Sequence, residues 1–187
     1  MAMEPTTDRL ADELLVMRCQ DGDAEAFDAL FRRWQPRLSG YARRLAADDT
    51  AAADAVQETW LAVVRGLRKL DDPATFRHWV YRIVTNKCAD QVRRAVRQRE
   101  LLRQAEDEAR AAGQPDAAPE SNVSVAAVRA AIGRLRPDRR AVLALHYAES
   151  QSVADISAIL GVPAGTVKSR LHHARQELKR LLGERKP

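Results

Sequence analysis

The spacing of apolar residues is the feature that most restricts the fold of this 187-residue chain. Over most of the stretch from Leu10 to Leu182, apolar side chains recur every three or four residues, and no stretch alternates apolar and polar residues convincingly. Helix-breaking residues are few, with eight Gly and eight Pro. The pattern predicts an all-α protein with helices over residues 8–20, 24–46, 50–70, 75–102, 125–135, 138–148, 152–160 and 164–182.

Residues with strong local preferences mark the ends of several predicted helices. Asp8, Asp138 and Ser152 can each cap a helix N-terminus with a side-chain oxygen. Gly161 can adopt the left-handed conformation that a tight turn needs, and Pro36 should kink the second helix because its ring removes a backbone donor. The segment 152–182 is therefore predicted to be a short helix, a glycine turn and a long helix.

Composition and charge divide the chain into two small helical domains. Residues 100–123 lose the apolar pattern and are rich in Ala, acidic residues and Pro, which predicts a flexible linker, whose first half can be helical, between domains at 1–99 and 124–187. Eight Lys and Arg stand against two Asp and Glu in 74–103, and 12 against six in 120–187. Two basic blocks joined by an acidic stretch are typical of a protein that contacts nucleic acid at two places.

Several classes of protein are excluded. No apolar run approaches the ~18–20 residues of a membrane span, and the N-terminus has no signal-peptide core, so we expect a cytoplasmic protein without membrane insertion of its own. Cys19 and Cys88 cannot form a disulfide framework or a zinc site. His172 and His173 point about 100° apart on a helix and cannot share a metal. Without a phosphate-binding loop or a nucleophile motif, we expect no enzyme activity, cofactor or metal.

The final helix has a face suited to DNA. Opposite its apolar stripe lie hydrogen-bonding and cationic side chains: Gly165, Lys168, Ser169, His172, His173, Arg175, Gln176 and Lys179. A helix of this kind, following a tight turn, can enter a major groove. The alternative is a solvated face on an ordinary helical hairpin, but turn, charge and spacing together favour DNA binding.

The fourth helix has a second basic face. Its members are His78, Arg82, Asn86, Arg93 and Arg97, flanked by Arg77, Lys87 and Arg94. Aromatic rings beside such cations can stack on unpaired bases. Periodicity places Trp60 and Trp79 in the core, so Tyr81 is the expected base contact.

The third helix is acidic, with Asp54, Gln57 and Glu58 followed by Leu61. Such a face repels phosphate and should be either bare or in contact with a protein. Periodicity alone favours a solvated face.

Several segments resemble one bacterial family. The stretch Asp54–Leu61 and the stretch Asp72–Arg94 are similar to the sigma-two core of extracytoplasmic-function (ECF) sigma factors of RNA polymerase. Leu135–Leu143 and Val153–Leu171 resemble the sigma-four helix-turn-helix. The resemblance covers nearly the whole chain in the same order, and implies a subunit that binds core RNA polymerase and directs promoter-specific transcription initiation.

The resemblance implies a role for each surface. Core polymerase would be bound by Asp54, Gln57, Glu58 and Leu61. The opened −10 element would be held beside the loop Leu70–Pro73 by Arg77, Tyr81, Arg82, Asn86, Lys87, Arg93 and Arg94. The −35 element would be read by Thr166, Lys168, Ser169, His172, His173 and Arg175.

The same resemblance implies the partners, which are the clamp helices of the polymerase beta-prime subunit, the flap of the beta subunit, promoter DNA and an anti-sigma factor.

Three positions depart from the family pattern. Ala53 stands where an acidic residue is common, which predicts a weaker clamp contact, and His172 and His173 replace an aromatic residue and an arginine, which predicts an altered −35 preference.

Two other functions remain open at this stage. A stand-alone helix-turn-helix regulator would bind duplex DNA tightly without polymerase at a two-fold symmetric site. A helical protein that only sequesters another regulator would not contact DNA.

Overall fold

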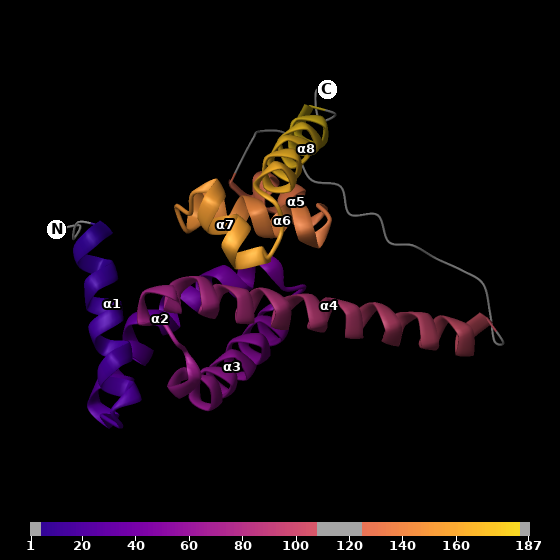
Figure 1. Ribbon diagram of the computed structural model, residues 1–187. Helices are drawn as coiled ribbons and strands as arrows, with labels where there is room; N and C mark the ends of the chain where they lie inside the picture. The colour runs from indigo at the N-terminus through magenta and orange to yellow at the C-terminus, as the bar shows by residue number, and fades with distance from the viewer. Residues whose placement is uncertain (1–4, 108–124, 184–187) are drawn as a thin grey trace.

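The computed structural model describes residues 5–107 and 125–183, and all of the regular structure in these ranges is helical (Figure 1). The first range contains α1 (Pro5–Gln20), α2 (Ala24–Leu45), α3 (Asp49–Gly66), the 3₁₀ helices η1 (Leu67–Lys69) and η2 (Pro73–Thr75), and α4 (Phe76–Asp107). The second contains α5 (Val125–Gly133), α6 (Pro137–Leu143), the π-helical turn η3 (Ala144–Ala148), α7 (Val153–Leu160) and α8 (Ala164–Gly183). The predicted all-α fold is confirmed. None of these described helices combines the length and apolar character that crossing a membrane requires.

The N-terminal domain packs α1 to α4 around an aromatic cluster. Trp34 of α2 is fully buried, with its ring centroid 5.4 Å from that of Phe76 and 5.6 Å from that of Tyr81. Tyr41 lies 5.3 Å from Tyr81, and all three pairs are edge-to-face. Such pairs add about 0.5–1.5 kcal/mol to the stability that area burial provides. The cluster fixes α4 against α2.

Helix α1 is attached to α2 by carboxylates. The prediction that Asp8 caps the first helix is wrong, because the helix begins at Pro5 and Asp8 lies inside it. The Asp8 carboxylate instead binds Arg33 and Arg37 of α2, at 2.6 and 2.7 Å. The hydrogen bond from Arg37 holds the pKa of Asp8 below its ordinary value.

Two side chains of this domain are more exposed than the sequence predicts. Phe31 and Val64 belong to the apolar stripes of the second and third predicted helices but are 37% and 59% exposed. Pro36 lies inside α2, which continues to Leu45, and the kink expected there stays a prediction. Helix α4 extends past residue 99 to Asp107, so the first eight residues of the predicted linker are helical. The apolar stripe of each helix is wider than the strip its neighbours cover, which leaves its edge in solvent.

The C-terminal domain contains the predicted short helix, glycine turn and long helix. Ser152 Oγ accepts a hydrogen bond from the Asp155 amide, and Asp155 Oδ2 accepts one from the Ser152 amide, which together cap α7. Gly161 ends α7 with φ of 65°, in the left-handed region. Asp138 does not cap α6, because Pro137 already occupies the first helical position.

Candidate functional site

Helix α8 separates an apolar face from a polar one. Val167, Leu171 and Ala174 are buried in the C-terminal domain, and Thr166 at the helix start is half-buried. The opposite face exposes five side chains that make no hydrogen bond or ion pair within the described residues: Lys168, Ser169, His172, His173 and Arg175. These groups are free to contact phosphates and base edges in a major groove.

Two ion pairs fix α8 from behind this face. Arg139 of α6 binds Glu177 at 2.5 Å, and Asp138 lies 3.5 Å from Arg170. Both pairs join α6 to α8 on the partly buried side of the helix. The exposed face is therefore presented by a helix whose rotation and position are set by its neighbours.

The basic face of α4 divides into an outer and an inner part. In the outer part, Asn86, Arg93, Arg94 and Arg97 are exposed. Arg77, near the helix start, is half-buried and places its guanidinium carbon 5.8 Å from the centroid of the Trp34 ring. The outer part is open to a polyanion, whereas the inner part is occupied by the C-terminal domain.

Three side chains of the inner part contact the C-terminal domain. His78 Nε2 lies 3.0 Å from Asp155 Oδ1, and the Tyr81 hydroxyl donates to Glu149 Oε2 at 2.6 Å. Arg82 donates to two carbonyl oxygens at the end of α7, those of Ala158 and Ile159. Arg44 of α2 adds an ion pair to Glu149 Oε1 at 3.3 Å. In this arrangement Tyr81 is buried and cannot contact DNA, whereas Arg82 remains exposed but has its guanidinium engaged by α7.

The expectation that Tyr81 presents an exposed ring is wrong for this arrangement. Its exposed fraction is 1%, and burial raises the pKa of its hydroxyl above the ordinary value. Trp60 is 7% exposed and Trp79 is half-buried against the core, as their spacing predicted. Cys88 is also buried, which raises the pKa of its thiol to about 11 and keeps it unreactive.

Glu58 does not belong to the free acidic face of α3. Its carboxylate turns toward α4, where it binds Lys87 at 2.9 Å and Arg94 at 3.4 Å. The hydrogen bond from Lys87 lowers the pKa of Glu58. Glu58 therefore joins the predicted polymerase surface to the predicted −10 surface, and it compensates two of the cations that the sequence assigned to DNA.

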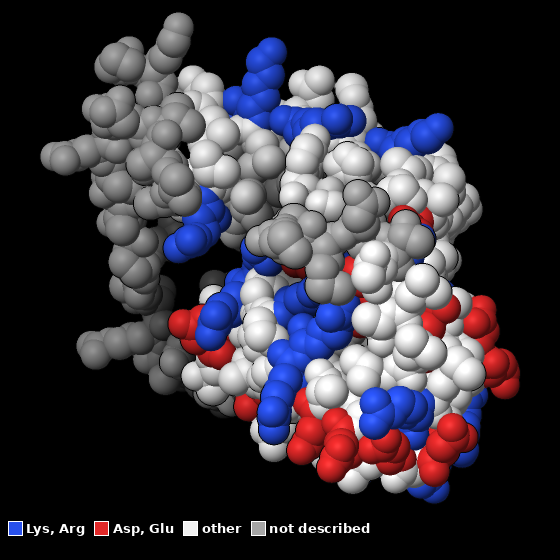
Figure 2. All heavy atoms as spheres, turned by 90° about the vertical axis from the view of Figure 1, so that its left-hand side faces the viewer, with Lys and Arg blue, Asp and Glu red and all other residues white. Residues whose placement is uncertain are grey.

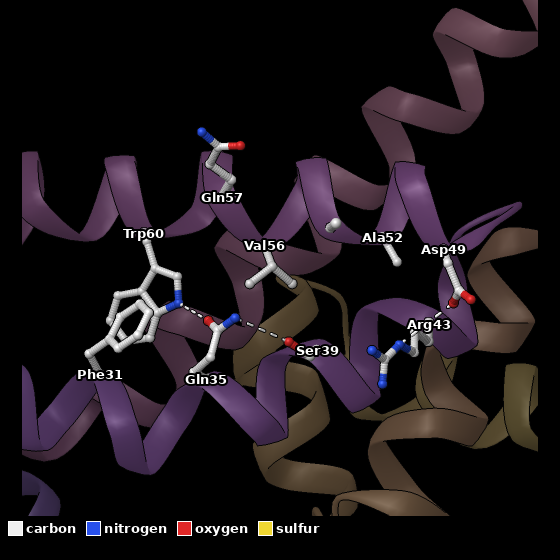
Figure 3. A pocket seen from close by; sticks show the side chains of 10 residues that line it. Phe31, Gln35, Ser39, Arg43, Asp49, Ala52, Val56, Gln57 and Trp60 are labelled. Atoms are coloured by element: carbon white, nitrogen blue, oxygen red, sulfur yellow. Dashed lines mark hydrogen bonds and ion pairs between the residues drawn. The ribbon is translucent and has the colours of Figure 1, made fainter.

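The remaining members of the acidic face are free. Asp54 and Gln57 are exposed and make no hydrogen bond or ion pair within the described part of the chain, and Leu61 is 49% exposed. Beside them α2 and α3 form a pocket of about 420 Å³ (Figure 3). Trp60 lies at one end, where its Nε1 donates to Gln35 Oε1 at 2.6 Å, and Gln57 points away from α2. Together these residues make a partly apolar surface suited to a protein partner.

Charges are unevenly distributed on the side of the molecule where α1 lies (Figure 2). Basic side chains stand in the middle of this face and at its top, and acidic side chains gather toward its lower end, with some basic side chains among them (Figure 2). A single surface thus offers an attractive region and a repulsive region to nucleic acid.

Comparisons with known proteins identify the family of each domain. Residues 30–98 match the family described as Sigma-70 region 2, and residues 122–178 match Sigma-70, region 4. The ECF RNA polymerase sigma factor SigM of Mycobacterium tuberculosis is 38% identical over 163 residues, which cover 87% of this chain and 80% of SigM. RNA polymerase sigma-H factor of Pseudomonas aeruginosa is 32% identical, with 91% of this chain and 93% of that protein covered.

Two solved structures are similar as well. The structure of CnrH in complex with the cytosolic domain of CnrY has a TM-score of 0.70 and 29% identity, and covers 94% of this chain and 99% of CnrH. The sigma factor RpoE of Bartonella quintana, in complex with the anti-sigma factor NepR, has a TM-score of 0.67 and 26% identity, and covers 87% of this chain and 100% of RpoE.

Proposed function

Because the chain belongs to the ECF sigma factors of bacterial RNA polymerase, which direct transcription initiation through regions 2 and 4, we propose which of its surfaces binds the core enzyme and which bind the promoter. Asp54, Gln57 and Leu61 bind the core enzyme, the outer face of α4 holds the opened −10 element, and the free face of α8 reads the −35 element. Sigma factors are non-catalytic subunits, so the protein acts by binding. The exposed, unpaired face of α8 carries this proposal most directly.

The core enzyme is bound through the clamp helices of its beta-prime subunit, which meet α3, and through the flap of its beta subunit, which meets the C-terminal domain. The exposed carboxylate of Asp54 and the apolar side chain of Leu61 support a protein partner, because DNA phosphates would be repelled there. Cytoplasmic localisation follows from this partner.

The −10 surface is smaller than the sequence predicted, at least while the two domains touch. Asn86, Arg93 and Arg94 are exposed, but Tyr81 and Arg82 are engaged by the C-terminal domain, and Glu58 pairs with both Lys87 and Arg94. Promoter binding therefore requires the two domains to separate. An anti-sigma factor that stabilises the contact would keep the protein inactive, and the complex of the similar RpoE with NepR supports such a partner.

In vitro transcription with purified core RNA polymerase on a promoter library tests the proposal. We expect transcripts only in the presence of the protein, from promoters that share an asymmetric bipartite site, and weak binding to duplex DNA without polymerase. Tight binding to a two-fold symmetric site in the absence of polymerase would instead indicate a stand-alone regulator.

Removing the Glu149 carboxylate should favour separation of the domains. In the contact the Glu149 side chain is only 11% exposed and serves both Tyr81 and Arg44. In Glu149→Ala the buried Tyr81 hydroxyl loses its acceptor. This destabilises the closed form, in which the two domains touch, by roughly 1–3 kcal/mol, but not the open form, in which water hydrates the hydroxyl. We expect the ratio of open to closed molecules to rise about tenfold. A larger radius of gyration in small-angle X-ray scattering checks this shift.

The matched control is Asp28→Ala, which removes an exposed carboxylate of α2 that has no hydrogen bond or ion pair within the described residues. It should leave the radius of gyration unchanged. If Glu149→Ala scatters like the control, the polar contact does not hold the domains together.

A further inference from the structure

A side chain of α1 reaches the loop between α3 and α4. Gln20, the last residue of α1, donates two hydrogen bonds from its Nε2 atom, to the carbonyl oxygens of Leu67 at 3.0 Å and Leu70 at 2.8 Å. The two bonds use both amide hydrogens of the side chain. Gln20 lies outside the segment 30–98 that matches region 2, so the family match assigns it no role.

The end of α1 is held in place, so the Gln20 amide has a defined position. Arg18 binds Asp23 at 2.6 Å, and Asp23 caps α2 by accepting a hydrogen bond from the Ala26 amide at 3.0 Å. Gly22 makes the intervening turn with φ of 93°, a conformation that strains other residues. The last turn of α1 is thereby fastened to the first turn of α2.

The two halves of the loop are supported differently. In the second half, Asp72 Oδ1 accepts from the Ala74 amide at 2.9 Å and the Thr75 hydroxyl donates to the Asp72 carbonyl at 2.6 Å, so this half supports itself. In the first half, the Leu70 amide donates to the Leu67 carbonyl at 3.2 Å, but the Leu70 carbonyl accepts a hydrogen bond only from Gln20 within the described residues. The path of the backbone into the loop therefore depends on a residue about 50 positions earlier in the chain.

We propose that Gln20 is a positioning residue for −10 recognition. By fixing the carbonyls of Leu67 and Leu70, it sets the entry of the loop Leu70–Pro73, beside which the opened −10 element is held. This inference rests on the proposed function, −10 recognition by the N-terminal domain, and on the place beside the −10 element that the family resemblance implies for the loop. A base held by hydrogen bonds is discriminated only while donors and acceptors keep their geometry, so a loosened loop loses selectivity before it loses general affinity for the strand.

Three substitutions separate positioning from general stability. Gln20→Glu keeps the shape but replaces the two N–H donors with an acceptor that faces two carbonyls. Gln20→Leu removes the polar atoms, and Gln20→Lys restores N–H donors of similar reach. The matched control is Asp21→Asn, in the same turn, because the exposed Asp21 side chain makes no hydrogen bond or ion pair within the described residues.

The readout is a discrimination ratio. A promoter selected from the library by the wild-type protein with core polymerase is compared with versions that differ in a single −10 base. The ratio is transcription from the promoter with the selected base divided by transcription from the promoter with the best competing base. We expect Gln20→Glu and Gln20→Leu to lower this ratio by about fivefold to tenfold, which is the effect of losing one neutral hydrogen bond between the loop and the base. Gln20→Lys should recover most of the ratio. Core binding and discrimination among −35 variants should stay as in wild type and in Asp21→Asn.

Two results would overturn the inference. One is a ratio that stays unchanged in Gln20→Glu and Gln20→Leu. The other is an equal loss on every −10 and −35 variant, accompanied by a lower melting temperature and without rescue by Lys, which is the signature of a purely structural residue. Failure of the proposed function is recognised separately, since the wild-type protein itself would then transcribe without dependence on the −10 sequence.

Discussion

Replacing Asp54 with Lys should abolish assembly with core RNA polymerase, with a loss of affinity of at least about 100-fold. The Asp54 carboxylate is exposed on α3 beside Gln57 and Leu61, and no ion pair within the described residues compensates it. A partner surface that accepts a carboxylate at this place offers donors or cations, and a lysine there meets like charge at a cost of several kcal/mol. Native gel electrophoresis and fluorescence anisotropy with purified core enzyme measure the loss.

The fold should tolerate this substitution, since an exposed side chain without partners contributes little to the free energy of unfolding. Asp28→Lys, a charge reversal at an exposed position of α2, is the control and should assemble as wild type does. Asp54→Lys that still co-migrates with the core enzyme would remove α3 from the proposed interface.

Charge reversal at Glu58 addresses a different contact. Because Glu58 binds Lys87 and Arg94, Glu58→Lys would bring three cations together between α3 and α4 and should lower the melting temperature. Loss of polymerase binding in that variant would therefore not identify a polymerase contact. The sequence motif grouped Asp54 and Glu58, whereas the structure separates them.

Local features of the fold were predictable because their signals lie close together in the sequence. The cap at Ser152 depends on Asp155 three residues later, and the turn at Gly161 depends on one backbone conformation. The free face of α8 follows from helical periodicity over the same stretch. The helix-turn-helix could thus be placed without knowledge of the tertiary structure.

Contacts between distant residues were not predictable in this way. The hydrogen bond between Tyr81 and Glu149 joins residues 68 positions apart, and the ion pair between Glu58 and Lys87 joins two helices. No periodic pattern reveals which residue of another helix will meet a side chain. Exposure inferred from one helix alone therefore failed at Glu58.

The burial of Tyr81 did have a signal in the sequence. It precedes Val84 and Cys88, both buried, by three and seven residues, which is helical spacing along one face of α4. Interpreting the ring as a base contact gave more weight to the neighbouring cations than to this spacing. For an aromatic residue at the edge of an apolar stripe, burial was the better prediction.

A double substitution on α8, Lys168→Ala with Arg175→Ala, should largely eliminate transcription that depends on the −35 element. A cationic side chain that contacts a base edge contributes about 1–3 kcal/mol, so the two together account for roughly 30-fold to more than 10,000-fold in affinity. If either contacts only a phosphate, binding weakens equally on all sequences. The slope of log K against log salt concentration then falls in magnitude by about one unit per contact. Quantitative in vitro transcription over a series of −35 variants and salt concentrations distinguishes the two modes.

The matched control for this variant is Arg129→Ala with Arg134→Ala, which removes the same charge from exposed positions of the same domain, one in α5 and one in the turn that follows it. Both double variants should melt close to wild type, because all four side chains are exposed. Only the α8 variant should lose discrimination among −35 sequences, since electrostatic attraction alone reads no bases. Equal losses in the two variants would mean that the C-terminal domain contributes net charge but no base readout, and the assignment of the −35 element to α8 would have to be abandoned.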